Sequence, residues 1–314
     1  MMWIFEIRND RFNHIGNTER LGWKYGTTIL PDLSDWDEFP FTRCCFSIGD
    51  LGIVSALPQL LKSKYPNLTI SLPSSKWVKE CVGQGTWAYQ NSEVSDNLDL
   101  IYANNPYVDY RFEPGQHELI YNDHHRCYRY ETEPLIEQLL RAWGFTEEEI
   151  ETIDSRPQLY FNQEEKEIGD SIIKKWIGNL NYGCSIFASR LDKYNYEWEG
   201  KNIDGIYNES LKYKDYPVFY YSSFNFPTNK NKWNTAFKEW ISFKDIPEAT
   251  IRIQMYIKQQ ALFNLGYQSG LGDACTGKSM HYVATPYEKL TETVLRGDNI
   301  YYYFPNGQKV CFKN

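Results

Sequence analysis

The sequence lacks the segments that would place it in or across a membrane. It contains no run of about 18 apolar residues, the length that a helix needs to cross a bilayer. Its start, Met-Met-Trp-Ile-Phe-Glu-Ile-Arg, has neither the basic beginning nor the apolar core of a secretory signal. These two absences predict a cytoplasmic protein with no transmembrane segment.

Positive charge is also in short supply. There are 33 Lys and Arg residues against 41 Asp and Glu, which gives a formal net charge of −8. Duplex nucleic acid is bound by a basic surface that displaces its counterions. Nucleic acid is therefore not expected as a partner.

Potential metal ligands are few and scattered. The seven cysteines are an odd number without any C-x-x-C pair, which argues against a disulfide framework and against a zinc ribbon. The five histidines include His117, His124 and His125, but no H-E-x-x-H spacing occurs. A polar loop is the simpler interpretation of these histidines, and no metal is expected.

Length and aromatic content are what the chain does have. Its 314 residues suit two domains of about 150 residues each. It carries 25 Tyr, 17 Phe and 10 Trp residues, which we expect mostly in the core, with stacking on sugar rings as another use for some.

A strand, a glycine turn, a helix and a second strand follow one another early in the chain. The apolar run 44–48 precedes Gly49-Asp50-Leu51-Gly52, and apolar positions 53, 54, 57, 60 and 61 then recur at helical spacing. The run 68–72 is a second strand. This βαβ pattern predicts a parallel sheet with helices on its faces.

The rest of the chain continues this rhythm. We expect strands at 3–7, 27–30, 98–103, 118–121, 184–188 and 218–221. We expect helices at 135–143, 146–153, 163–176, 233–243 and 251–263. The extended, proline-marked segment 156–161 predicts a boundary between a domain 1–155, with an N-terminal extension 1–40, and a domain 156–314.

Asp50 is the first candidate for chemistry. It lies at the carboxyl end of a predicted strand, where ligands bind in open α/β sheets. An aspartate there can take a proton from an acceptor hydroxyl as a general base. The alternative is that Asp50 caps the following helix.

Two further constellations point to a phosphate group. The stretch 270–284 reads as a glycine-rich loop that leads into a helix, with Thr276 or Ser279 as the N-cap and Lys278 as added charge. His281 in this stretch is either functional or simply packed. Arg190 and Lys193 follow the first strand of the second half and suit a diphosphate, or else a solvated charged loop.

Several of these residues also resemble a known family. Phe46-Ser47-Ile48-Gly49-Asp50-Leu51-Gly52, then Ala56-Leu57-Pro58 and Lys64-Tyr65-Pro66, resembles the opening of the heptosyltransferase-like glycosyltransferases of family 9. The segment 156–165 is similar to the link between that family's domains. Thr276-Gly277-Lys278-Ser279-Met280-His281 is similar to its loop near the nucleotide-sugar diphosphate.

The resemblance implies an α/β protein of GT-B type, in which two Rossmann-like domains with parallel sheets face a central cleft. It implies inverting, metal-independent transfer of a sugar from a nucleotide diphosphate sugar to a glycan or related hydroxyl acceptor. That donor is a co-substrate, and no cofactor is expected. Carried across by position, Asp50 would be the general base and Gly49 and Gly52 would lie near the acceptor. The donor would be bound by Thr276, Gly277, Lys278, Ser279, His281, Arg190 and Lys193.

Two other functions remain open at this point. One is a nucleotide-sugar epimerase on the same scaffold, because a fold does not fix a function. The other is a non-catalytic glycan-binding or assembly protein of the same fold.

Overall fold

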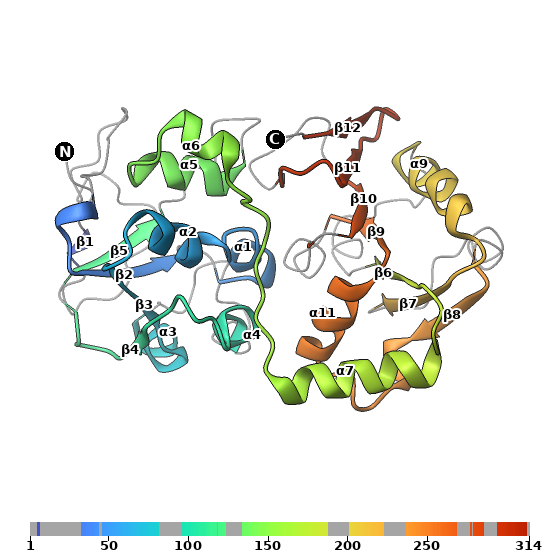
Figure 1. The fold of residues 1–314 in the computed structure, drawn as a ribbon, viewed down its shortest axis with the longest axis horizontal. Coiled ribbons are helices and arrows are strands. Elements are labelled where there is room, and N and C mark those ends of the chain that lie inside the picture. Colours follow the sequence, from blue (N-terminus) through green and yellow to red (C-terminus); the bar gives the residue numbers. More distant parts are fainter. Residues whose placement is uncertain are drawn as a thin grey trace. The chain divides into compact units, whose positions relative to one another are not determined.

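The chain divides into two compact units, each built around a sheet of its own. A computed structural model describes residues 5–6, 33–43, 46–81, 96–117, 119–123, 134–187, 201–222, 237–268, 277, 279–285 and 294–312. The first unit comprises Met1–Ser155 and Glu292–Val294, and the second comprises Arg156–Thr291 and Leu295–Asn314. Figure 1 shows the elements of each unit along the chain.

The first unit contains both strands and helices along its length. Its strands are β1 (Phe5–Glu6), β2 (Glu38–Arg43), β3 (Thr69–Pro73), β4 (Tyr110–Phe112) and β5 (Leu119–Asp123). Its helices are η1 (Leu33–Asp35), α1 (Ile48–Gly52), α2 (Leu57–Lys64), α3 (Ser75–Cys81), α4 (Asn97–Tyr102), α5 (Leu135–Ala142) and α6 (Glu147–Thr152).

The first sheet is parallel apart from one edge strand. Its order is β1-β5-β2-β3-β4, and only β1 runs antiparallel to its neighbour. The central strand β2 pairs with a different neighbour in each half. Residues 38–40 pair with β3, whereas residues 41–43 pair with β5.

Three predictions for this unit are wrong. The strand before Asp50 is Glu38–Arg43 rather than 44–48, and Pro40 lies inside it. The expected glycine turn at 49–52 is the short helix α1. The expected strand 98–103 is the helix α4, because Leu98, Ile101 and Tyr102 share one buried helical face. The predicted strand 27–30 lies outside the described residues.

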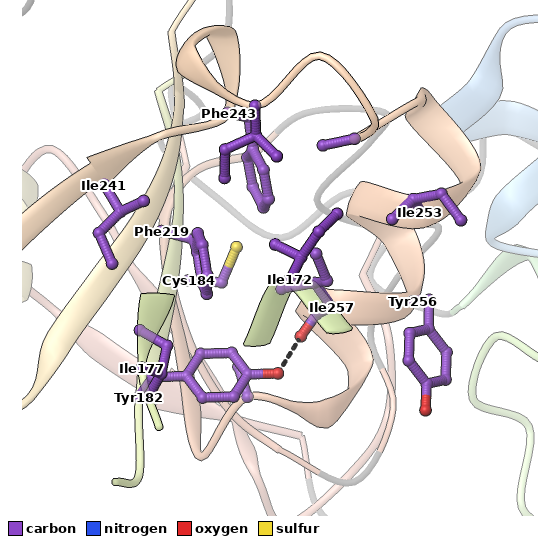
Figure 2. Close-up of a cluster of buried hydrophobic side chains, with 13 residues drawn as sticks. Ile172, Ile177, Tyr182, Cys184, Phe219, Ile241, Phe243, Ile253, Tyr256 and Ile257 are labelled. Atoms are coloured by element: carbon purple, nitrogen blue, oxygen red, sulfur yellow. Dashed lines mark hydrogen bonds between the residues drawn. The ribbon is translucent and has the colours of Figure 1, made fainter. Parts of the chain in front are cut away.

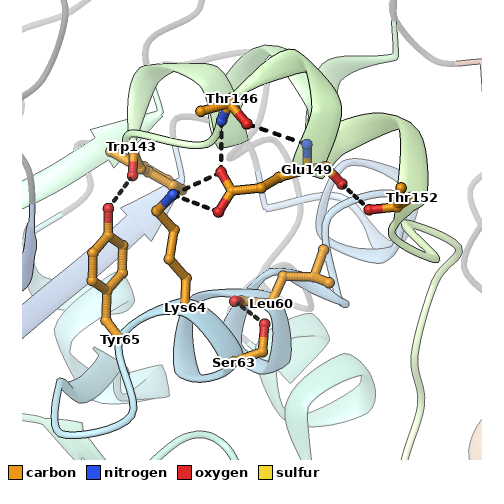
Figure 3. Close-up of polar contacts among 8 residues, drawn as sticks. All are labelled: Leu60, Ser63, Lys64, Tyr65, Trp143, Thr146, Glu149 and Thr152. Atoms are coloured by element: carbon orange, nitrogen blue, oxygen red, sulfur yellow. Dashed lines mark hydrogen bonds and ion pairs between the residues drawn. The ribbon is translucent and has the colours of Figure 1, made fainter.

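Helices α2, α5 and α6 are joined over one face of β2. The Trp143 ring, at the end of α5, meets Phe39 and Phe41 edge-on at centroid distances of 5.1 and 5.3 Å. Tyr65 donates a hydrogen bond to the Trp143 carbonyl, and Lys64 donates to both oxygens of Glu149 at 2.7 and 2.8 Å (Figure 3). Aromatic packing and one ion pair therefore fix the helical layer over the central strand.

The second unit has the longer sheet. Its strands are β6 (Gly183–Phe187), β7 (Pro217–Ser222), β8 (Glu239–Ser242), β9 (Phe263–Tyr267), β10 (Met280–Ala284), β11 (Ile300–Tyr303) and β12 (Lys309–Cys311). Its helices are α7 (Gln163–Trp176), α9 (Lys201–Ser210), η5 (Leu211–Tyr213), η6 (Phe243–Asp245) and α11 (Ile251–Gln260). The sheet order is β12-β11-β10-β9-β6-β7-β8, parallel except for β12.

Helices cover both faces of this sheet, as a buried parallel sheet requires. On one face α7 and α11 pack over Cys184 and Phe219 (Figure 2). The Tyr182 hydroxyl donates to the Ile257 carbonyl at 2.8 Å inside this cluster. On the other face α9 packs over Tyr282 and Tyr303, so many of the tyrosines are core residues, as expected.

One helix predicted for this unit is wrong, and another is present but ends earlier than expected. The described part of 233–243 is strand β8 followed by η6, not a helix. The helix from Ile251 ends at Gln260, and Phe263 begins a strand, β9, that the periodicity did not reveal. The α7 prediction, Gln163–Trp176, is confirmed at both ends.

Candidate functional site

Asp50 follows the strand at which the first sheet reverses its order. From β2 the chain moves outward through β3 to β4, and it then returns to place β5 on the opposite side of β2. In open α/β sheets, ligands bind beyond the carboxyl ends of the strands at such a reversal. Asp50 lies seven residues beyond Arg43, the last residue of β2.

The Asp50 carboxylate is held at the beginning of α1. Ser47 is the N-cap, and its hydroxyl accepts a hydrogen bond from the Asp50 backbone N–H at 3.3 Å. The same hydroxyl donates to Asp50 Oδ2. Asp50 is therefore not the capping residue itself; it is the third residue of the helix and is oriented by the cap.

Helix α1 has one partly exposed side and one buried side. Ser47, Gly49 and Asp50 are partly exposed, whereas Leu51 and Gly52 are buried. Gly49 and Gly52 have helical backbone conformations, so the sequence does not need glycine there for a left-handed turn. A glycine at position 49 keeps the surface beside Asp50 small.

The second sheet repeats the reversal at its own first strand. From β6 the chain moves through β7 to β8, and β9 then takes the other side of β6. Arg190 and Lys193 come after β6 and so follow the strand at the reversal, but both lie outside the described residues. Thr276 and Lys278 also lie outside them.

The amino edge of this sheet, where its parallel strands begin, holds Gly277, Ser279 and His281. The helix predicted to begin there is wrong, because residues 280–284 form β10. Met280 pairs with Phe263, and Phe263 pairs with Gly183, so β10, β9 and β6 all begin at this level. Gly277, Ser279 and His281 therefore lie at or near the amino edge, whereas Phe187 ends β6 at the carboxyl edge.

Ser279 and His281 are also buried. Their exposed fractions are 8% and 2%. The Asn264 amide donates to Ser279 Oγ at 2.7 Å and lies 3.4 Å from His281 Nε2. Burial lowers the pKa of the His281 imidazole well below its usual range, and the Lys258 ammonium acts in the same direction. A neutral, enclosed histidine of this kind is a packed residue.

Gln268, two residues before the glycine-rich stretch, lies at the carboxyl edge of the sheet. Gln268 directly follows β9, and its backbone N–H donates to the carbonyl of Ala284, the last residue of β10, at 2.9 Å. The sequence-based prediction lacks this placement because β9 is absent from the predicted strands. The run Phe-Asn-Leu-Gly-Tyr before the glycines was the available signal.

The described residues include no helix with the length and apolarity to traverse a bilayer. No protein-family profile matches the sequence, and no curated protein matches it. Among solved structures, the chain is similar to the glycosyl transferase family 9 protein from Veillonella parvula DSM 2008. The TM-score is 0.55 at 8% identity, over 86% of each chain.

A second similar structure is the E. coli ADP-heptose LPS heptosyltransferase II. The TM-score is 0.43 at 12% identity, over 84% of this chain and 89% of the other. The first of these likenesses carries the conclusion: the chain has the GT-B type α/β fold of that family 9 glycosyl transferase, as expected from its sequence.

Proposed function

We propose that the protein is a glycosyltransferase that moves a sugar from a nucleotide diphosphate sugar to a hydroxyl of a glycan or related acceptor, with inversion at the anomeric carbon. The observation that carries the proposal is the position of Asp50, a partly exposed carboxylate just beyond the reversal point of the first sheet. The family 9 fold supports the same reaction class.

In the proposed reaction Asp50 takes the proton of the acceptor hydroxyl. The acceptor oxygen then forms a bond to the anomeric carbon, and the bond from that carbon to the diphosphate oxygen breaks. The diphosphate leaves with the electron pair. Ser47 donates a hydrogen bond to Asp50 Oδ2 and so fixes the carboxylate for this transfer.

We place the donor beyond the carboxyl edge of the second sheet, at the reversal between β6 and β9. Arg190 and Lys193 would offset the charge of the diphosphate there, without a metal. Gly277, Ser279 and His281 are left out of this donor site, because the edge at which they lie is the opposite one.

The experiment combines donor binding with turnover. Titration calorimetry against UDP, GDP, ADP and their common sugars identifies the nucleotide, and release of the nucleoside diphosphate with a panel of glycans then measures transfer. Asp50→Asn should lower the rate at least about 100-fold, within the usual range for loss of a general base, and leave donor affinity within about twofold.

Asp37→Asn is the matched control. Asp37 is exposed and directly precedes β2, so it lies at the amino edge of the same strand that Asp50 follows. It should turn over like the wild type. Undiminished turnover by Asp50→Asn would remove Asp50 from the proposal, and binding of no nucleotide at all would overturn the transferase assignment.

A further inference from the structure

Helix α4 lies against residues 46–52, the segment that contains α1 and carries Asp50 and that we call the Asp50 turn. It contacts this turn at both ends. The side-chain amide of Asn97, the first residue of α4, donates to the Phe46 carbonyl at 3.0 Å. The hydroxyl of Tyr102, the last residue of α4, lies 3.5 Å from the Leu51 carbonyl and is buried. Phe46 precedes α1 and Leu51 lies within it, so the two contacts bracket Asp50.

The spacing of these contacts gives the two segments a common direction. Asn97 and Tyr102 are five residues apart, and so are their partners Phe46 and Leu51. The start of one segment contacts the start of the other, and the end contacts the end. Helix α4 therefore contacts the Asp50 turn along its length; α1 and α4 are both labelled in Figure 1.

α4 is itself supported by the edge strand β4. The Arg111 guanidinium donates from Nη2 to the Leu98 carbonyl at 3.4 Å and stacks on the Tyr102 ring, 5.7 Å from its centroid. It also lies 3.8 Å from Asp99 Oδ1, and Asp99 accepts a hydrogen bond from the Ser75 hydroxyl. A continuous set of contacts thus leads from the sheet through α4 to the turn.

The turn needs this support because α1 has only five residues. A helix of that length is not stable by itself, since its few hydrogen bonds do not offset the cost of nucleation. Its internal hydrogen bonds, such as that from the Leu51 N–H to the Ser47 carbonyl at 3.0 Å, therefore need contacts from neighbouring elements to persist. Of the two α4 side-chain contacts to this turn described above, that of Asn97 is the shorter.

We propose that Asn97 is a positioning residue for the Asp50 carboxylate. It touches no reacting atom; it fixes the carbonyl from which the Asp50 turn begins. The inference rests on the proposed function for the part that concerns catalysis, and on the contacts alone for the part that concerns the turn. A small displacement of a catalytic group can cost about 100-fold in rate.

The first measurement concerns the turn and requires no activity. Asn97→Asp keeps the shape of the side chain but replaces the donor by a charged acceptor, which the Phe46 carbonyl repels. Hydrogen exchange in a peptide covering residues 46–57 should become about tenfold faster, while peptides from α5 and α6 remain unchanged. Asn67→Asp, at an exposed turn before β3, is the matched control and should change neither.

The second measurement uses the donor and acceptor identified for the wild type. Asn97→Asp should lower kcat about tenfold or more with the donor KM nearly unchanged, and Asn97→Gln, which keeps an amide donor, should recover part of that loss. If Asn97→Asp does not fold, Asn97→Ala takes its place.

The outcomes separate this inference from the proposed function. Unchanged exchange in residues 46–57 overturns the role of Asn97 whatever the activity is. Faster exchange with normal kcat, in a protein that Asp50→Asn inactivates, also overturns it. Normal turnover of Asp50→Asn itself is a failure of the proposed function and leaves the exchange result standing as the test of the turn.

Discussion

The Arg252 guanidinium donates two hydrogen bonds to the Glu165 carboxylate, from Nε to Oε1 at 2.5 Å and from Nη2 to Oε2 at 3.0 Å. Arg252 also donates to the Tyr160 carbonyl and lies over the Phe161 ring, 4.8 Å from its centroid. One side chain of α11 therefore holds both the first turn of α7 and the extended segment before it.

Loss of this ion pair should destabilise the second unit. The side chains of Arg252 and Glu165 are only 10% and 17% exposed, so Arg252→Met leaves a nearly buried carboxylate without its partner. We expect a cost of about 3 kcal/mol in the free energy of unfolding, measured by urea titration.

The first unit offers a comparison for that pair. Arg141 binds Glu147 through two nitrogens as well, but Glu147 is 66% exposed. Double-mutant cycles on the two pairs should give a coupling of about 2 kcal/mol or more for Arg252–Glu165 and less than about 1 kcal/mol for Arg141–Glu147. Equal couplings would contradict the assignment of the difference to burial.

The buried His281 should make stability depend on pH. Its pKa in the folded protein lies below the value of the unfolded chain, so the unfolded state binds the proton more readily. Stability is then complete above about pH 6.5 and falls as the pH decreases below it. Between pH 6.5 and 5.5 the wild type should lose about 1 kcal/mol more than His281→Gln, in urea titrations at each pH.

An equal loss in the two proteins would show that other groups dominate. His117 is the control, because it belongs to the first unit and its side chain is 15% exposed. His117→Gln should not remove the pH dependence in the second unit.

Lys309 should stabilise the edge of the second sheet most strongly near neutral pH. Burial raises the pKa of Glu209, but hydrogen bonds from Lys212 and Lys309 lower it by more than burial raises it. The resulting pKa is about 2. Lys309 also lies 4.3 Å from the centroid of the Tyr301 ring. Lys309→Met should cost about 1–2 kcal/mol at pH 7.

The effect of Lys309→Met has a defined pH range. A carboxylate whose pKa is lowered on folding contributes stability above its unfolded value, and that contribution is lost as the pH falls toward 2. The difference between wild type and Lys309→Met should therefore shrink from pH 4.5 to pH 3 in urea titrations. Lys214→Met, at an exposed position, should show no such change.

Gly169 in α7 provides a test of packing against helix propensity. Alanine is normally favoured over glycine in a helix by about 1 kcal/mol. A Cβ at Gly169, however, would lie 2.3 Å from Cδ1 of the Tyr256 ring. Because Tyr256 also donates to Asp170 Oδ1 at 2.8 Å, the ring is not free to move aside.

Gly169→Ala should therefore destabilise the protein by about 1–3 kcal/mol, measured by thermal or urea unfolding. The same substitution in a Tyr256→Leu background should be tolerated better. A stabilising effect of Gly169→Ala in the wild type would show that Tyr256 relaxes easily.

The sequence predicted elements best where local signals determine them. Helix α7 begins at a capping box formed by Asn162 and Glu165, and both reciprocal hydrogen bonds are present. Helix α6 begins in the same way at Thr146. These contacts lie within four residues of the chain, so they can be read without knowledge of the fold.

Several of the failures depend on tertiary context. Pro40 argues against a central strand, yet β2 accommodates it where its pairing passes from β3 to β5. Residues 280–284 end a glycine-rich stretch whose pattern predicts a helix, but they form a strand in which the alternate residues Met280, Tyr282 and Ala284 pack into one hydrophobic cluster. Asp50 could be selected from its place after an apolar run, whereas Asn97 could not, because only the fold brings residue 97 to residue 46.

The reversal of strand order in both sheets also affects how the chain is made. In each unit the central strand is synthesised early, well before the second of the two strands that pair with it. The interval from Arg43, the end of β2, to Leu119, the start of β5, is 76 residues. The interval from Phe187, the end of β6, to Phe263, the start of β9, is also 76 residues. At ribosomal rates of about 5–20 residues per second, this takes roughly 4–15 s. During that time an apolar strand has one unpaired side, so the nascent chain is most exposed to misassociation twice during its synthesis.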